Sequence, residues 1–228
     1  MLDLYTDATP NGLKISIALE EMGLDYTTHQ VFLGGEQQTL EFTALNPNQK
    51  IPVLVDDGQV ITESGAILIH LAEKTGRFLP TDPKQRIATL EALMFQMASV
   101  GPMFGQYLVF AAAWGNKFPD VTGRYFTEVS RIMGVLNTRL EGQDYLAGDE
   151  FTIADMAVAP WIRLCGLHPA CGDLPLVSNA NLKSWWDRVA ERPAVQRGFE
   201  NPAPYAPEKQ FKGFVDAVVG LGELHKAS

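Results

Sequence analysis

The first 80 residues combine segments of two-residue hydrophobic period with segments of helical period. Leu2 to Tyr5 alternates, which predicts a strand, and a 3.6-residue pattern then ends at Gly23, a typical helix C-cap. Asp56-Asp57-Gly58 between two apolar runs predicts a β-hairpin. The predicted strands are Leu2–Tyr5, Tyr26–Phe32, Pro52–Val55 and Val60–Ile61, and the predicted helices are Lys14–Met22, Leu40–Leu45 and Glu63–Lys74. This order predicts an α/β N-terminal domain.

After Pro80 only helical periods remain. The segment Pro80 to Pro83 is the best candidate for a linker. Apolar residues then recur at steps of three and four, which predicts one long helix with a buried seam and a bend at Pro102. The seam consists of Ile87, Leu90, Met94, Met97, Gly101, Phe104 and Leu108.

The rest of the chain also predicts helices. Thr152 and Asp155 form a capping box, which typically opens a core helix. The other predicted helices are Tyr125–Leu140, Asn181–Glu191, a short one from Pro193, and Phe211–Val219. The expected organisation is an α/β domain over residues 1–80, a linker over 81–86, an all-α helical bundle over 87–200 and a tail over 201–228.

Composition narrows the classes of function. The net charge is −9 without a Lys/Arg cluster, so we expect no nucleic-acid partner. Cys165 and Cys171 are the two cysteines, and their spacing matches no common zinc or redox motif, so neither a disulfide scaffold nor a metal site is expected. We expect no signal peptide, no membrane-spanning run and therefore a cytoplasmic protein.

Two short segments suit a peptide-like ligand. Pro52 has no N–H, so the backbone of Ile51 just before it is expected to remain free to pair with an extended peptide. Glu63 and Ser64 fall where the next helix should begin, where free N–H groups and a hydroxyl suit a carboxylate and the Glu63 side chain suits an ammonium. A ligand that has peptide bonds in its middle and an amino-acid zwitterion at one end would fit both segments, and glutathione is such a ligand.

A thioredoxin-like half followed by a helical half, with Ile51-Pro52, Glu63-Ser64 and the Thr152 capping box, resembles the glutathione S-transferase superfamily. The resemblance implies a cis peptide before Pro52 and a homodimer whose two-fold axis is lined by the first long helices of the helical domain. The runs Thr9 to Gly12, Asn46 to Pro52 and Gly101 to Gln106 are most similar to the bacterial nu class. Members of that class act mainly as glutathione-dependent disulfide-bond reductases and can hold two glutathiones or one oxidised glutathione.

The chemistry of such a site depends on stabilising a thiolate, because a free thiol titrates near ~8.5. Asn11 occupies the position that holds a cysteine in beta-class relatives, so the nucleophile must be the ligand's own sulfur. Thr9 and Asn11 are the candidate catalytic residues, as hydrogen-bond donors to that sulfur beside a helix N-terminus. The simpler interpretation is that Thr-Pro-Asn-Gly only starts the helix, and one residue can do both.

Three further residues are candidate ligand contacts, each with a plainer alternative, and the resemblance favours Gln37 and Arg131 among them. Gln37 would reach the glycine end, or be a solvated loop residue. Lys50 would contact the glycine carboxylate, or be an ordinary exposed lysine. Arg131 would face a second glutathione, or form an ion pair with Glu128.

The expected function is that of a glutathione-dependent disulfide reductase that acts on a small disulfide and needs no metal. Two alternatives remain at this point. One is a conventional glutathione transferase acting on an electrophile, and the other is a non-catalytic glutathione-binding regulatory module.

Overall fold

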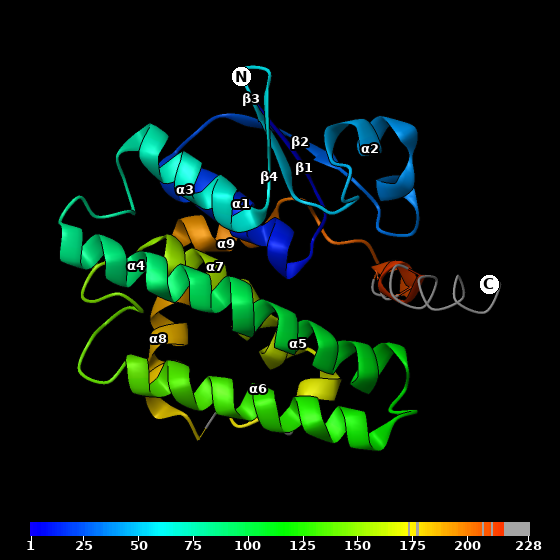
Figure 1. Cartoon of the computed structure of the whole chain (residues 1–228), viewed down its shortest axis with the longest axis vertical. Coiled ribbons are helices and arrows are strands. Elements are labelled where there is room, and N and C mark those ends of the chain that lie inside the picture. The colour runs from blue at the N-terminus through cyan, green and yellow to red at the C-terminus, as the bar shows by residue number, and fades with distance from the viewer. Residues whose placement is uncertain (173, 177, 207, 211, 217–228) are drawn as a thin grey trace.

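The computed structural model describes residues 1–172, 174–176, 178–206, 208–210 and 212–216 (Figure 1). Its sheet has four strands in the order β2-β1-β3-β4. β1 pairs in parallel with β2, and the antiparallel hairpin of β3 and β4 is added at β1. The strands are β1 (Leu2–Thr6), β2 (Tyr26–Gln30), β3 (Val53–Asp56) and β4 (Gln59–Thr62). The predicted α/β domain is confirmed, although β2 ends two residues earlier than expected and β3 begins one residue later.

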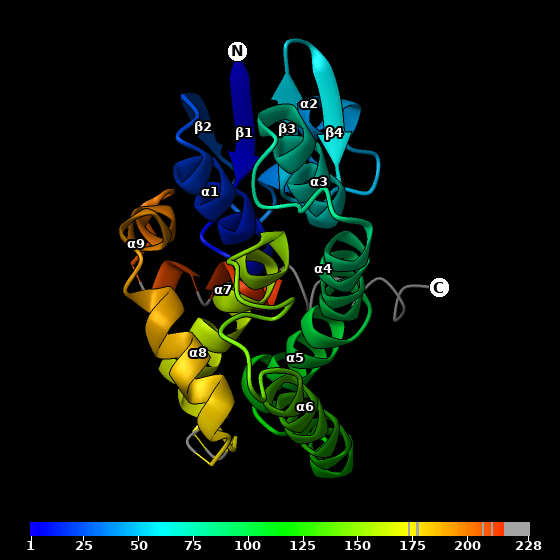
Figure 2. The same ribbon diagram turned by 90° about the vertical axis from the view of Figure 1, so that its left-hand side faces the viewer.

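Three helices and one 3₁₀ turn complete this domain. They are α1 (Pro10–Met22), η1 (Glu36–Gln38), α2 (Leu40–Leu45) and α3 (Ser64–Thr75). α1 begins four residues before the predicted start at Lys14, because Thr9 caps it and Pro10 occupies its first position. α1 and α3 cover one face of the sheet and α2 lies on the other (Figure 2). Val31, Phe42 and Val53 form a small core beneath α2.

The predicted long helix is present but is not uniform. It consists of α4 (Pro83–Phe95), a π-helical segment η2 (Gln96–Val100), α5 (Gly101–Leu108) and a second π-helical segment η3 (Val109–Ala113). Pro102 is the second residue of α5, so the N–H that proline lacks is missing at the junction with the π-helical segment η2. The predicted seam is wrong at Ile87 and Met94, which are 61% and 49% exposed, because α4 is apolar on both faces and buries Thr89, Ala92 and Leu93 instead.

The segment from Pro83 to Ala113 is long and apolar enough to span a membrane by length and composition alone, which differs from the expectation that no run would be. A long apolar helix in the core of a protein has the same length and composition as a membrane-spanning helix. α4 packs against α7 (Ile153–Leu167), and α5 packs against both α7 and α6 (Pro119–Arg139). We therefore interpret the segment as part of the helical core.

The capping box is confirmed and extends further than expected. Thr152 caps α7, and the fully buried Asp155 also accepts hydrogen bonds from Leu146 N and from Trp185 Nε1. Trp185 lies on α8 (Ala180–Ala190), so Asp155 joins two helices and a loop. The remaining elements are η4 (Pro169–Cys171), α8 (Ala180–Ala190) and α9 (Pro193–Glu200).

The two halves share one hydrophobic core, because α1 packs against α7 and α9 and α3 packs against α7. α4 begins at Pro83, inside the segment expected to be the linker. The predicted helix Phe211–Val219 lies partly outside the described residues, among which 208–210 and 212–216 are helical.

Candidate active site

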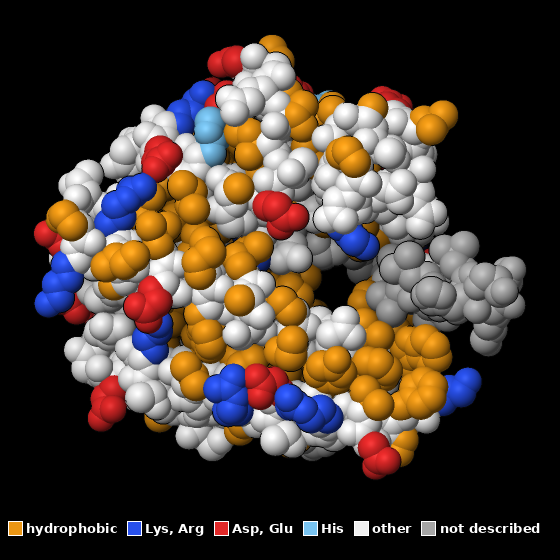
Figure 3. Space-filling view, viewed as in Figure 1, with side chains coloured by type: hydrophobic (Ala, Val, Ile, Leu, Met, Phe, Trp, Pro, Cys, Tyr) orange, Lys and Arg blue, Asp and Glu red, His pale blue; other side chains and the backbone are white. Residues whose placement is uncertain are grey.

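A cavity of about 890 Å³ lies between the sheet domain and the helical domain. Its first wall contains five of the residues singled out from the sequence: Thr9, Asn11, Gln37, Lys50 and Ile51. The opposite wall is largely apolar and contains Gly105, Val109, Phe110, Trp114 and Trp161. Figure 3 shows a hollow between the sheet domain and α5, bordered by hydrophobic side chains. The cavity is large enough for a tripeptide.

The N-terminus of α1 supplies hydrogen-bond donors to this cavity. Thr9 Oγ1 accepts a hydrogen bond from Gly12 N at 3.3 Å, so the hydroxyl proton can still be donated. The backbone N–H and the side-chain amide of Asn11 make no hydrogen bond with any described residue. Thr9 therefore performs the capping role, and both residues retain donors on the cavity wall.

Asp7 was missed by the sequence analysis and also lines the cavity. It is 1% exposed and accepts hydrogen bonds from Ala8 N at 2.8 Å and from Gln30 Nε2 at 3.2 Å. Burial raises the pKa of this carboxyl group against the effect of those donors. The sequence did contain a signal for Asp7: it directly follows the first strand, and side chains at strand ends are often placed at functional sites.

The peptide-binding prediction at Ile51 agrees with the local geometry. The Ile51–Pro52 peptide is cis, as the resemblance implied. Neither the N–H nor the C=O of Ile51 is hydrogen-bonded within the described part of the chain, so both are open to an extended ligand. Val53 pairs with Thr62, which brings Ile51-Pro52 and Glu63-Ser64 to the same end of the hairpin.

Glu63 and Ser64 stand beside the cavity and do not line it. Glu63 has a φ of 68°, a left-handed backbone conformation that is uncommon for a non-glycine residue and clusters at binding sites. It is exposed and precedes α3 without capping it through its side chain. Ser64 is 4% exposed at the first position of α3. An acidic side chain and a helix N-terminus thus stand together, as the zwitterion prediction requires.

The second residue missed by the sequence analysis is Lys14 on α1. Its side chain is 1% exposed, and Nζ donates to Gln96 Oε1 at 2.7 Å and to Ser64 Oγ at 3.2 Å. Burial lowers the pKa of this ammonium from 10.5 to about 7, while the charge of Glu63 acts in the opposite direction. A lysine in an amphipathic helix carries no sequence signal for such burial.

The three remaining candidates differ in their surroundings. Gln37 is buried and closes its own loop, since Nε2 donates to Leu33 O at 2.8 Å and Oε1 accepts from Gly35 N. Lys50 is exposed at the rim of the cavity. Arg131 is exposed on α6, forms two hydrogen bonds to Glu128 at 2.7 and 2.9 Å, and does not line the cavity.

The chain after α9 returns to this cavity. Gln210, Gly213 and Phe214 line it, and the ring of Tyr205 packs edge-on against Phe32. Lys209 Nζ lies 3.8 Å from the centroid of the Tyr205 ring. The described part of the tail therefore forms a third wall.

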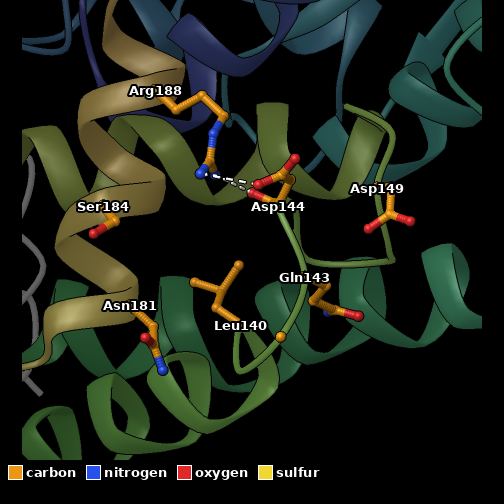
Figure 4. Close-up of a pocket in the computed structure, with 8 residues that line it drawn as sticks. Leu140, Gln143, Asp144, Asp149, Asn181, Ser184 and Arg188 are labelled. Atoms are coloured by element: carbon orange, nitrogen blue, oxygen red, sulfur yellow. Dashed lines mark hydrogen bonds and ion pairs between the residues drawn. The ribbon is translucent and has the colours of Figure 1, made fainter.

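A second pocket, of about 380 Å³, lies in the helical domain and differs in character. Figure 4 shows Arg188 of α8 directed at Asp144, and the two side chains form an ion pair at 3.0 Å. Asp149 and Asn181 also line this pocket. Its one cationic side chain, Arg188, is already paired with Asp144, and its volume is less than half that of the cavity between the two domains, so it is a poor candidate for the active site. Among the described residues, no group of three or more acidic, histidine or cysteine side chains is arranged to hold a metal ion.

Models of the glutathione S-transferase N-terminal and C-terminal domains match residues 8–74 and 103–193. The chain belongs to the glutathione S-transferase family and is an enzyme of that type. It is similar to the disulfide-bond oxidoreductase YfcG of Escherichia coli, at 41% identity over 86% of this chain and 93% of the relative. It is also 37% identical to the disulfide-bond oxidoreductase YghU of the same organism, over 86% of this chain and 73% of the relative.

Solved structures of the family contain glutathione in two forms. A glutathione transferase from Pseudomonas putida, with one glutathione disulfide bound per subunit, is 42% identical with a TM-score of 0.84, over 88% of this chain and 91% of that one. A glutathione transferase from Burkholderia graminis, with two glutathione molecules per subunit, is 43% identical with a TM-score of 0.84, over 88% of each chain.

Proposed function

We propose that this protein is a glutathione-dependent disulfide reductase in which bound glutathione supplies the reacting sulfur. The observation that carries the proposal is the α1 N-terminus, where Thr9 and Asn11 present donors to a cavity that neither Cys165 nor Cys171 lines. The names of the relatives YfcG and YghU and the glutathione disulfide bound in the P. putida structure support it.

In this proposal glutathione binds along the first wall of the cavity. The Ile51 backbone pairs with its cysteinyl residue, Gln37 and Lys50 contact its glycine end, and Glu63 and Ser64 bind its γ-glutamyl end. The Thr9 hydroxyl and the Asn11 amide then donate to the sulfur. One hydrogen bond to a charged acceptor contributes about 1.5–3 kcal/mol, enough to lower a thiol pKa by one or two units.

The reaction consists of two thiol–disulfide exchanges. The bound thiolate attacks one sulfur of the substrate disulfide, so that a mixed disulfide forms and one substrate thiolate leaves and takes up a proton. A second glutathione thiolate attacks the glutathione sulfur of that mixed disulfide, releases the second substrate thiol and forms glutathione disulfide. Two glutathiones are oxidised for each disulfide reduced. Arg131 as a contact for the second glutathione stays a prediction, since its side chain is paired with Glu128 here.

The test is turnover of a small model disulfide, 2-hydroxyethyl disulfide, coupled to glutathione reductase. We expect Asn11→Ala to lower kcat by about 10- to 100-fold and to weaken glutathione binding much less, because its hydrogen bond strengthens as the sulfur becomes negative. Gln38→Ala, which removes an exposed amide outside the cavity, is the control and should behave as the unmodified protein.

Equal losses of kcat and affinity in Asn11→Ala would contradict its role at the sulfur. Tight glutathione binding by the unmodified protein without disulfide turnover would contradict the reductase proposal itself and favour the regulatory module.

Conventional conjugation is the second candidate, and the apolar wall favours it. Phe110, Trp114 and Trp161 would accommodate an apolar electrophile, whereas a second glutathione is polar. Thiolate stabilisation serves both reactions equally. Turnover of 1-chloro-2,4-dinitrobenzene that exceeds disulfide turnover would assign the site to conjugation.

We also propose a cytoplasmic homodimer that buries the exposed face of α4. Ile87 and Met94 on α4 and Val135 on α6 are exposed, and Figure 3 shows hydrophobic side chains gathered over α4. Such a patch is typical of an interface. We expect sedimentation equilibrium to give twice the chain mass of 25.1 kDa, and Ile87→Asp combined with Met94→Lys to give the monomer mass. A monomeric unmodified protein at micromolar concentration would overturn the proposal.

A further inference from the structure

Lys14 is a buried cation without an anion. Its Nζ has three neighbours within contact distance, Ser64 Oγ at 3.2 Å, Gln96 Oε1 at 2.7 Å and Met97 Sδ at 3.6 Å, and all three are neutral. It forms no salt bridge with any described residue. A buried charge is expensive unless it is paired, so this arrangement indicates that a counter-ion comes from outside the chain.

The geometry defines where that anion would bind. An ammonium can only donate, so Ser64 Oγ accepts from Lys14, and the Ser64 hydroxyl proton is available to another acceptor. Its present acceptor is Met97 Sδ at 3.8 Å, a weak one. The first N–H groups of α3, those of Ser64, Gly65 and Ala66, donate to no described residue. A hydroxyl proton, a helix N-terminus and a buried ammonium therefore converge beside Glu63.

We propose that Lys14 is a positioning residue for the γ-glutamyl α-carboxylate of glutathione, to which it supplies the buried counter-charge through Ser64. The proposal rests on the glutathione-binding function proposed above. Lys14 does not touch the ligand: it fixes the direction of the Ser64 hydroxyl and adds a positive charge one layer behind it. The α-amino group of the same ligand is left to Glu63.

The helical domain holds Lys14 in place. Gln96 accepts from Lys14 Nζ, and its own Nε2 is buried with no partner among the described residues. A Cβ on Gly101 would lie only 2.9 Å from that Nε2, and a Cβ on Gly65 would lie 3.1 Å from Met97 Cγ. The π-helical segment η2 thus approaches α3 closely enough for the two domains to enclose the ammonium together.

Few other charges act on Lys14. Glu63 is the one ionised group that contributes to its pKa. The other charged or titratable groups on the elements packed against α1 are His70, Glu73 and Lys74 of α3, Asp155, Arg163 and Cys165 of α7, and Arg192, Arg197 and Glu200 at α9. None of them pairs with Lys14: His70 and Lys74 bind Asp56, Glu73 binds Arg86, and Arg192 and Arg197 bind Glu21 and Glu20. The α-amino group of the ligand is the remaining titratable neighbour.

Carboxylate binding should therefore be linked to protonation of Lys14. In the free protein its pKa is about 7, and an anion bound nearby raises this pKa. Near pH 8 the free ammonium is mostly deprotonated, so binding takes up close to one proton. The contribution to affinity is present below the free pKa and is lost as the pH rises through the pKa of the complex.

Isothermal titration calorimetry at pH 8 in phosphate and in Tris measures this proton directly. S-methylglutathione is the ligand, because it has no thiol to ionise. We expect net uptake of about one proton by the unmodified protein, none by Lys14→Met, and an affinity about 10- to 100-fold weaker for Lys14→Met. Lys14→Gln, which keeps a polar side chain without the charge, provides a second variant and should also take up none.

The control ligand is S-methyl-(4-aminobutyryl)-cysteinylglycine, which lacks only the α-carboxylate. It should bind the unmodified protein and Lys14→Met equally and without proton uptake. Uptake that persists in Lys14→Met and Lys14→Gln, or binding of S-methylglutathione without uptake, would overturn the role of Lys14 and leave the proposed function intact. Failure of glutathione itself to bind would overturn both.

Discussion

Replacing Asp155 with alanine should destabilise the folded protein by about 3–5 kcal/mol, because the carboxylate is fully buried and holds three segments together. It accepts from Thr152 N at 2.9 Å, Thr152 Oγ1 at 3.0 Å, Leu146 N at 2.9 Å and Trp185 Nε1 at 2.8 Å. Alanine leaves these buried donors without an acceptor, and each unsatisfied donor costs about 1–3 kcal/mol.

Urea denaturation followed by tryptophan fluorescence measures this effect, because Trp185 is itself one of the partners. Asp187→Ala is the matched control: Asp187 lies on α8 and forms an exposed ion pair with Lys183, so its loss should change the free energy of unfolding by less than about 1 kcal/mol. A loss below about 1 kcal/mol in Asp155→Ala would show that the network does not hold the helical domain together.

Local patterns predicted the elements that local chemistry determines. The capping box at Thr152, the hairpin turn at Asp57-Gly58 and the helix end at Gly23 all depend on neighbouring residues, and the structure contains each of them. Thr9, Asn11 and Ile51, which a turn sequence and an X-Pro dipeptide mark in the sequence, line the cavity, and their roles toward the ligand stay predictions that rest on the family resemblance.

What the sequence could not predict depends on distant packing. Gln96 is 82 residues from Lys14, and nothing near Lys14 in the chain distinguishes it from a surface lysine. The prediction that Ile87 and Met94 belong to the buried seam was wrong for a related reason. Periodicity identifies the apolar faces of a helix but does not say which face packs against the core. The return of the tail to the cavity at Phe214 had no local signal either.

Replacing Lys14 with methionine should have the opposite effect on stability, raising the free energy of unfolding by about 1–4 kcal/mol at pH 6. Methionine has nearly the same length and needs no counter-charge. The folded pKa of Lys14, about 7, is below the unfolded value of 10.5, so the unfolded chain binds more protons between these values. The contribution of Lys14 to stability therefore rises with pH across that window, and its penalty is fully present below pH 7.

Urea denaturation at pH 6, 8 and 9.5 should accordingly show the largest advantage of Lys14→Met at pH 6 and a smaller one at pH 9.5. Lys84→Met, at an exposed position of α4, should follow the unmodified protein at every pH. Identical pH profiles for Lys14→Met and the unmodified protein would show that Lys14 is not a buried cation in solution.

The ligand should narrow this difference in stability, since a 10- to 100-fold ratio of affinities corresponds to about 1.4–2.7 kcal/mol. A ligand that binds the folded state stabilises it according to its affinity, so saturating S-methylglutathione should stabilise the unmodified protein more than Lys14→Met. A lysine retained only for packing would leave the difference in stability unchanged when the ligand is added. The destabilising charge is then explained by binding: below pH 7 the free protein carries an ammonium that has no ion-pair partner among the described residues, and the carboxylate that compensates it arrives with the ligand.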